Sequence, residues 1–175
     1  MDAIRYLADI LSWLLLLAFV LRLLFQLVRA DFRDPLADAV VRVTNWLVLP
    51  LRRVLPPVRK IDTATVVAVL LIALGRTALT LLLAGYGSLA WLAGLRLSVI
   101  DLVTLLLKIY LFGLLAYWII GLIAPGGYSP GLRLLSQLCE PVLKPVRRLI
   151  PPIGRIDFSP LWLSILISAL LLLVR

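Results

Sequence analysis

Residue types that carry most enzyme chemistry are scarce in this sequence of 175 residues. There is no histidine, and there is one cysteine and one methionine. This scarcity excludes histidine acid–base catalysis, a serine–histidine triad, histidine metal sites and a disulfide framework. The acidic residues Asp9 and Asp101 are too scattered for a catalytic pair, and no glycine-rich phosphate loop occurs. We therefore expect no enzyme activity, no metal and no cofactor.

Basic residues are the main charged feature, and they favour binding over catalysis. Eighteen Lys and Arg against nine Asp and Glu give a net charge of +9. The pairs Arg52-Arg53 and Arg147-Arg148 could bind phosphate, because a guanidinium holds such an anion through two parallel hydrogen bonds. Basic residues beside a membrane span also set its orientation without binding any partner. Both roles are open for these two pairs.

The two arginine pairs belong to an internal repeat. The segment from Pro50 to Asp62 returns 95 residues later, without a gap, from Pro145 to Asp157. More than charge is kept at fixed spacing, since basic residues in any order would set the topology. We therefore predict that the repeated residues, with the Ser-Pro pair after the second copy, dock a lipid or a protein partner. They are Pro50, Arg52, Arg53, Pro56, Pro57 and Asp62, and Pro145, Arg147, Arg148, Pro151, Pro152, Asp157, Ser159 and Pro160.

Membrane-spanning helices are the elements that must position these residues. Apolar residues make up 63% of the chain and the mean hydropathy is +1.09, which excludes a water-soluble globule. Four runs are long enough to cross a hydrocarbon core of about 30 Å as helices. They cover about residues 4–28, 63–84, 98–124 and 158–174. The two long connectors hold twelve of the eighteen basic residues, so the positive-inside rule places both in the cytoplasm and both termini outside.

The repeat predicts an all-α membrane protein with two parallel halves. The first repeat covers 1–84, a short outer connector 85–97, and the second repeat 98–175. Each repeat consists of a span, an amphipathic helix in the interface plane, a basic Pro-Pro turn and a second span. With an even number of spans in each, the repeats should be related by an axis along the membrane normal.

Proline and serine residues predict where the connectors turn. The amphipathic helices should follow X-Pro turns at Asp34-Pro35 and Ser129-Pro130. Their apolar stripes are Leu36, Val40, Val43 and Leu47 in the first helix, and Leu134, Leu135, Leu138 and Val142 in the second. Paired prolines then break each helix, and Ser159 should be the N-cap of the last span, with Pro160 at the first helical position.

Three basic residues lie well inside the predicted spans, away from the outer ends, where charge is costly. Arg22 is close enough to the cytoplasmic end of its helix to extend to the interface as an anchor. Arg76 and Lys108 lie deeper and need partners. The acidic residues on that side are Asp9 and Asp101, so we predict an ion pair of Arg76 with one of them.

The third predicted span also carries a polar stripe. Asp101, Thr104 and Lys108 are spaced by three and four residues and therefore share one helix face. Such a stripe could line a water-filled cavity or an ion path, or its charges could form a structural ion pair between the repeats. The single cysteine, Cys139, could be palmitoylated or redox-active, but a lone buried cysteine is most often a small apolar residue.

The duplicated segment carries a family resemblance. The Pro-Arg-Arg-hydrophobic-hydrophobic-Pro-Pro run that leads to Asp-Phe-Ser-Pro, from Pro145 to Pro160, resembles the YggT family, also called YlmG in some bacteria. The resemblance covers the whole chain in a two-repeat, four-span form. The first copy departs from it, with Asp62-Thr-Ala-Thr in place of Asp-x-Ser-Pro. The resemblance implies no enzymatic activity, and it implies links to cell division, osmotic tolerance, potassium homeostasis and, in chloroplast relatives, cytochrome-complex maturation.

These observations lead to one expected function and one alternative. We expect a multi-pass protein of the bacterial cytoplasmic membrane that acts as an assembly, organising or scaffold factor. Its expected partners are anionic phospholipids and other membrane proteins. Nucleic acid is not expected, because no aromatic–basic platform or reading motif occurs outside the spans. The alternative is a small channel or transporter component for ion or osmotic homeostasis, and the oligomeric state is open.

Overall fold

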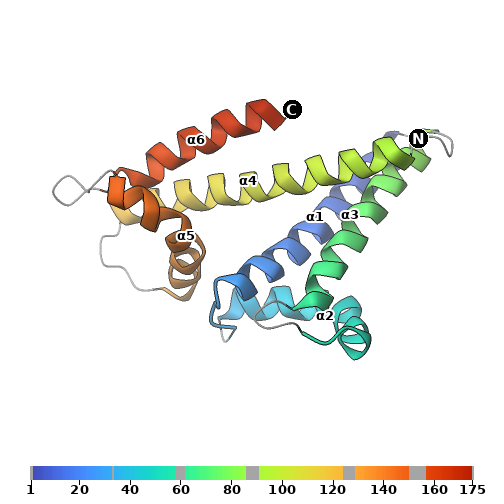
Figure 1. Cartoon of the computed structure of the whole chain (residues 1–175), viewed down its shortest axis with the longest axis horizontal. Coiled ribbons are helices and arrows are strands. Elements are labelled where there is room, and N and C mark those ends of the chain that lie inside the picture. The colour runs from blue at the N-terminus through green and yellow to red at the C-terminus, as the bar shows by residue number, and fades with distance from the viewer. Residues whose placement is uncertain are drawn as a thin grey trace. The chain divides into compact units, whose positions relative to one another are not determined.

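The architecture is helical throughout the part of the chain that the computed structural model describes, residues 2–32, 34–57, 62–85, 91–123, 129–149 and 157–174. The helices in Figure 1 are α1 (Asp2–Leu27), α2 (Pro35–Val54), α3 (Thr63–Leu83), α4 (Trp91–Ile123), α5 (Pro130–Leu149) and α6 (Ser159–Val174). No strand occurs in these ranges. The all-α class predicted from the sequence is therefore confirmed.

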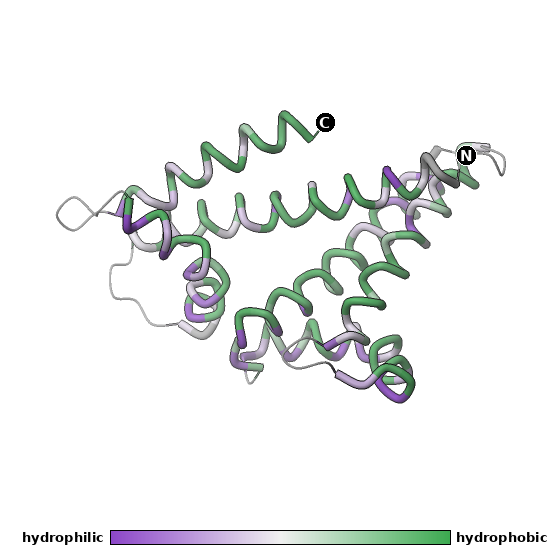
Figure 2. Tube along the Cα trace, viewed as in Figure 1, coloured by the Kyte–Doolittle hydropathy of each residue, from purple (hydrophilic) through white to green (hydrophobic). Residues whose placement is uncertain are grey.

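Three of the four predicted spans reach the length that a membrane requires. Helices α1, α3 and α4 are long and apolar enough to cross a membrane. Helix α6 has 16 residues, or about 24 Å at 1.5 Å per residue, which is shorter than a typical hydrocarbon core. Figure 2 shows hydrophobic residues along α6 and the middle turns of α1, α3 and α4, and hydrophilic residues on α2 and α5.

Two compact units make up the chain, and they differ from the two sequence repeats. One unit contains Met1–Leu27 and Ala39–Val103, and the other contains Val28–Asp38 and Thr104–Arg175. Helix α4 contributes residues to both units. It begins at Trp91 rather than near residue 98 as predicted, because the run Trp-Leu-Ala-Gly-Leu-Arg-Leu contains no proline that would stop a helix.

The core of the first unit lies between α1 and α3. Phe19 of α1 is fully buried, and Leu16 and Val20 are nearly so. The residues that α3 buries are mostly small, and they include Ala64, Ala68, Val69 and Ala73. Small side chains let two helix backbones approach closely, which is how apolar helices pack where no water drives them together.

Small residues also join the start of α4 to the end of α3. A methyl group added at Gly94 would lie 3.0 Å from the Cδ1 atom of Leu81. One turn later, the Ser98 hydroxyl donates a hydrogen bond to Thr77 Oγ1 at 2.8 Å. The absence of a side chain at Gly94 therefore permits this close approach of the two helices.

The second unit buries one apolar cluster drawn from α4, α5 and α6. Leu114, Cys139, Leu143 and Ile167 are its buried members. One residue of the predicted apolar stripe of α5, Leu135, packs against this cluster, and two others, Leu134 and Leu138, are buried. This packing places the polar side of α5 outward.

Helices α2 and α5 begin at matching capped turns. Asp34 Oδ1 accepts a hydrogen bond from the Leu36 amide at 2.9 Å, and Ser129 Oγ accepts one from the Leu132 amide at 3.2 Å. Each X-Pro turn is therefore an N-cap followed by proline at the first helical position, an arrangement that needs no amide from the proline.

Both helices run further than the repeat predicted. We expected the arginine pairs to lie in the Pro-Pro turns, but α2 includes Pro50 and ends at Val54, while α5 includes Pro145 and ends at Leu149. A single proline removes one hydrogen bond and can be tolerated, whereas the paired Pro56 and Pro57 cannot continue a helix. The arginine pairs consequently lie in the last helical turn of α2 and of α5.

Candidate functional site

The first candidate site is the junction between the end of α2 and the start of α3. Arg52 donates a hydrogen bond from Nε to Asp62 Oδ2 at 2.9 Å, and its Nη2 contacts the same oxygen. Asp62 is the N-cap residue of α3, so this pair ties the two helices across the Pro-Pro turn. The same oxygen accepts hydrogen bonds from Thr65 Oγ1 at 2.8 Å and Gln26 Nε2 at 3.3 Å. We call Arg22, Gln26, Arg52, Asp62 and Thr65 the first junction.

The second junction repeats this arrangement between α5 and α6. Arg147 Nε donates to Asp157 Oδ2 at 2.7 Å. Its Nη1 donates to Glu140 Oε2 at 3.1 Å, and its Nη2 lies 3.4 Å from the Tyr117 hydroxyl of α4. Arg147 is therefore held by three side chains, whereas Arg52 contacts one. We call Tyr117, Glu140, Arg147 and Asp157 the second junction.

The repeated arginines differ in what they contact. Arg52 and Arg147 form ion pairs with aspartates of the same chain, and these pairs recur 95 residues apart. Arg53 and Arg148 are exposed, and neither has a hydrogen-bond or ion-pair partner among the described residues. Of the four arginines predicted to dock a ligand, these two are therefore available to one.

The structure describes some of the prolines of the repeated motif and the serine that follows its second copy. Pro56 accepts a hydrogen bond through its carbonyl from Thr63 Oγ1 at 2.8 Å, which closes the first turn. Pro151 and Pro152 lie outside the described residues. Ser159 was expected as the N-cap of the last span, but Phe158 has that position because its carbonyl accepts the first hydrogen bonds of α6. The Asp157 carboxylate instead accepts a hydrogen bond from the Ser159 amide at 2.9 Å, while Ser159 and Pro160 are buried.

Both junction carboxylates are stabilised in their charged form. Burial would raise the pKa of Asp62, but hydrogen bonds from Arg52, Thr65 and Gln26 outweigh it and lower that pKa below its usual value. Burial would likewise raise the pKa of Asp157, but the Ser159 amide and the Arg147 guanidinium lower it. Burial would lower the pKa of Arg147, and its acidic and phenolic partners raise it instead.

Arg22, which was predicted to anchor its helix at the interface, is buried against α2. It is 2% exposed, and its Nη1 donates to Thr44 Oγ1 at 2.7 Å and to Asn45 Oδ1 at 2.9 Å. The Nε of Arg22, Gln26 Oε1 and Asp62 Oδ1 are buried without a hydrogen-bond partner in the described chain.

The two junctions carry opposite excess charge. Arg22 and Arg52 in the first junction face one carboxylate, Asp62, so one positive charge is left over. In the second junction Arg147 faces two carboxylates, Glu140 and Asp157, so one negative charge is left over. The duplicated backbone motif therefore has two different electrostatic environments.

Three of the charges predicted to lie inside the membrane, Asp9, Arg76 and Asp101, form a separate cluster in the first unit. Arg76 of α3 donates to Asp101 of α4 at 2.5 Å and to Asp9 of α1 at 2.8 Å. Arg76 thus contacts both of the acidic residues that were predicted as alternatives. No hydrogen bond or ion pair of Thr104 or Lys108 is present in the described part of the chain, so the polar stripe of α4 is not connected into a network.

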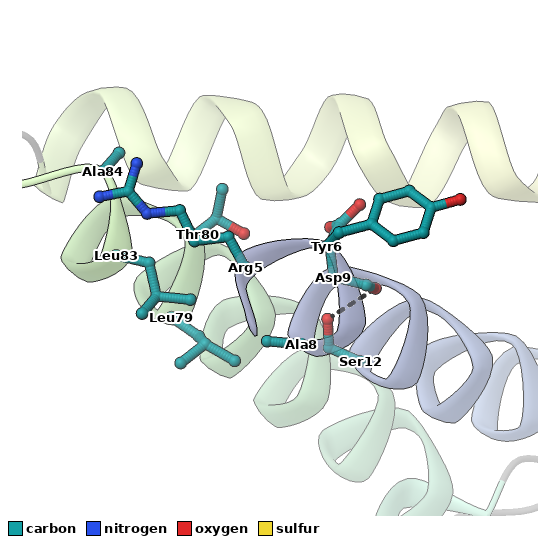
Figure 3. Close-up of a pocket in the computed structure, with 9 residues that line it drawn as sticks. All are labelled: Arg5, Tyr6, Ala8, Asp9, Ser12, Leu79, Thr80, Leu83 and Ala84. Carbon is teal, nitrogen blue, oxygen red and sulfur yellow. Dashed lines mark hydrogen bonds between the residues drawn. The ribbon is translucent and has the colours of Figure 1, made fainter. Parts of the chain in front are cut away.

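A pocket of about 350 Å³ lies beside this cluster, between the ends of α1 and α3. Figure 3 shows Arg5 extending from α1 toward Thr80 and Ala84, and Asp9 next to Ser12. The Ser12 hydroxyl donates to the Asp9 carbonyl at 3.0 Å. Sequence reasoning missed this pocket because its residues come from two separate helices.

Cys139 is packed as an apolar residue. It is fully buried in the core of the second unit. Burial, together with the nearby charge of Glu140, raises the pKa of its thiol to about 11. A thiolate is therefore disfavoured at neutral pH, which removes the reactivity that redox chemistry or acylation needs.

Several junction residues were missed by sequence reasoning, and two signals could have found them. Gln26 lies one helical turn after Arg22, so both share one face of α1. Tyr117 is the repeat counterpart of Arg22, 95 residues later. The helix spacing would have placed Gln26 in the first junction, and the repeat spacing would have placed Tyr117 in the second.

Comparisons with known proteins give a consistent result. The profile of the CCB3/YggT family matches residues 1–83 and 97–175. An uncharacterized protein of Pseudomonas aeruginosa is 41% identical over 170 residues, which cover 97% of this chain and 86% of that relative. An uncharacterized Escherichia coli protein named YggT is 31% identical over 172 residues, which cover 95% of this chain and 86% of the relative. No solved structure matches this chain.

Proposed function

The chain belongs to the CCB3/YggT family, as its repeated basic segment predicted, and on that premise we propose that it organises or assembles other components of the bacterial cytoplasmic membrane without enzymatic activity. The long connectors face the cytoplasm in this proposal, and both termini lie outside. Cell division and osmotic tolerance, the processes that the sequence resemblance implies, are the settings in which we propose that it acts.

The observation that carries this proposal is the recurrent Arg–Asp tie. In both repeats a guanidinium on the last turn of an amphipathic helix is bound to the carboxylate before the next apolar helix. This tie fixes α2 and α5 against apolar helices, so their last turns are held rigidly. Arg53 and Arg148, which follow the tied arginines, are thereby presented outward in a defined position. An exposed guanidinium on a fixed helix turn is suited to docking acidic groups, because its planar fork can donate two parallel hydrogen bonds.

Site-specific crosslinking in native membranes tests the proposed docking. A photoreactive amino acid is placed at Val54 or at Leu149, which are 77% and 82% exposed, so that Arg53 and Arg148 are kept. We expect discrete adducts with other membrane components, protein or phospholipid, from both positions. The double variant Arg53→Gln/Arg148→Gln should lose them, and Arg96→Gln, which removes an exposed charge near the start of α4, should not.

Two results would contradict the docking role. Adducts of unchanged yield in the double variant would show that the arginines do not hold the partner. Loss of the same adducts in the Arg96→Gln control would show that net charge, and not the position of the arginines, determines the contact.

A channel or transporter component is the second candidate function. It is favoured by the charges of Asp9, Arg76 and Asp101 inside apolar helices and by the pocket beside them. Charged residues at such depth often mark ion or substrate paths. Purified protein in liposomes should then give an ion flux that Lys108→Leu and Asp9→Asn reduce, and the absence of any flux would eliminate this candidate.

A further inference from the structure

The outward faces of α2 and α5 differ at positions that correspond in the repeat. Val43, Trp46, Leu49 and Arg53 of α2 correspond to Leu138, Pro141, Lys144 and Arg148 of α5. The backbone motif and the last arginine are the same in both helices. The residues that precede that arginine are not, so the two faces are suited to different partners.

The α2 face combines exposed apolar side chains with a free guanidinium. Val43 is 55% exposed, Trp46 60% and Leu49 50%. Arg53 follows Leu49 by four residues and Trp46 by seven, so helix geometry places it on their side. The apolar stripe predicted for this helix is therefore partly left outward, while Ala37, Thr44 and Val48 form its buried side.

Trp46 is held in place although it is largely exposed. Its ring packs edge-on against the buried ring of Phe19 in α1, with centroids 6.3 Å apart and the planes at 88°. Tryptophan favours the boundary between lipid headgroups and acyl chains, where its ring meets apolar atoms and its N–H meets water. The fixed ring marks the depth of that boundary on α2.

The α5 face offers no apolar surface of this kind. Leu138 is buried, with 5% of it exposed. Pro141, Lys144 and Arg148 are exposed. The neighbouring junction also carries the excess of negative charge, whereas the junction next to Arg53 carries the excess of positive charge.

We propose that the α2 face binds one anionic phospholipid and that the α5 face does not. The phosphate lies at Arg53, and the acyl chains lie along Val43, Trp46 and Leu49. This inference rests on the proposed docking function and names the ligand of its first half. The two repeats then bind different ligands: the first binds a lipid, and the second binds acidic groups of a protein.

Native mass spectrometry of the full-length protein measures this binding directly. The protein in detergent is titrated with phosphatidylglycerol, and separately with zwitterionic phosphatidylcholine. We expect one phosphatidylglycerol to be retained in preference to phosphatidylcholine. Arg53→Gln should lower its occupancy about fivefold, the effect of one basic residue at an anionic surface, and Arg148→Gln should leave it within about twofold of the parent.

Two tryptophan variants, compared with each other, provide a second and independent measurement. Trp46→Ala should lower phosphatidylglycerol occupancy, because it removes the apolar surface under the acyl chains. The matched control is Trp162→Ala, which removes an exposed tryptophan from α6 (55% exposed) and should have no effect. Circular dichroism confirms that each variant keeps its helix content before occupancy is compared.

Three results would each overturn the inference and leave the proposed function unchanged. Equal losses in Arg53→Gln and Arg148→Gln would mean that both repeats bind lipid alike. Equal retention of phosphatidylcholine would mean that headgroup charge is not recognised. If Arg53→Gln leaves lipid occupancy unchanged while the double variant still loses its crosslinks, the lipid inference fails and the docking function stands.

Discussion

Arg147 Nε lies 2.7 Å from Asp157 Oδ2 and so joins α5 to the residues just before α6. Arg52 and Asp62 form the same pair 95 residues earlier in the chain. In each case the pair joins the last turn of an amphipathic helix to the residue before an apolar helix. The equal spacing of arginine and aspartate in the two repeats therefore has a structural reason, since the pair joins two helices in each copy.

Removing the tied arginine should destabilise the protein more than removing its neighbour. Arg147→Gln leaves Glu140 and Asp157 without their cation, so we expect a loss of about 1–2 kcal/mol, below the value for fully buried pairs because these groups are partly exposed. Arg148→Gln, an exposed change, should stay within about 0.5 kcal/mol. Chemical unfolding in detergent compares the two. Equal losses would contradict a structural role for the Arg147–Asp157 pair.

Acid should weaken both junctions. The pKa values of Asp62 and Asp157 are lowered in the folded chain. At a pH between the folded and the unfolded pKa of each carboxyl group, the unfolded state therefore binds more protons than the folded state. Their contribution to stability is full above the unfolded pKa of about 4 and is lost as the pH falls through the folded pKa. The melting temperature should thus be steady from pH 7 to 5 and fall below about pH 4. The variant Asp62→Asn/Asp157→Asn should melt lower at pH 7 and show a shallower fall.

The Arg76 cluster should depend on charge balance. Arg76→Leu leaves Asp9 and Asp101 facing each other among apolar helices, and we expect a loss of folded protein after purification. The triple variant Arg76→Leu/Asp9→Asn/Asp101→Asn removes all three charges and should recover most of it. The yield of monodisperse protein by size-exclusion chromatography reports both effects. Failure of the triple variant to recover would show that Arg76 acts through something other than its two acids.

Cys139 should be inert in the folded protein. Its thiol is buried, with its pKa raised to about 11, so alkylation at pH 7.5 should be at least tenfold slower than in the unfolded chain, by an order-of-magnitude argument from thiolate population and access. Mass spectrometry after timed iodoacetamide treatment measures the rate. Rapid labelling of folded protein, or a native acyl adduct at Cys139, would contradict this packing role.

Much of the fold could be predicted, because apolar run length and proline position act locally. The helical class, the apolar helices and the capped turns at Asp34-Pro35 and Ser129-Pro130 follow from hydrophobic length, the N-cap hydrogen bond and the fixed φ of proline. The end of α2 at Val54 follows from the paired prolines after it. The early start of α4 at Trp91 was missed because no strong capping residue marks it.

Less of the candidate site could be predicted, since its contacts join residues far apart in the chain. The sequence by itself determined that arginines recur beside Pro-Pro turns, that charge is concentrated in the long connectors, and that histidine chemistry is absent. Only the tertiary structure decided which arginine of each pair is bound and which is free. The physical reason is that a carboxylate ten residues away reaches Arg52 and Arg147 only after two helices pack. Packing likewise decided that Arg22 is buried on Thr44 and that Trp46 faces outward, because burial depends on the neighbouring helix and not on residue type.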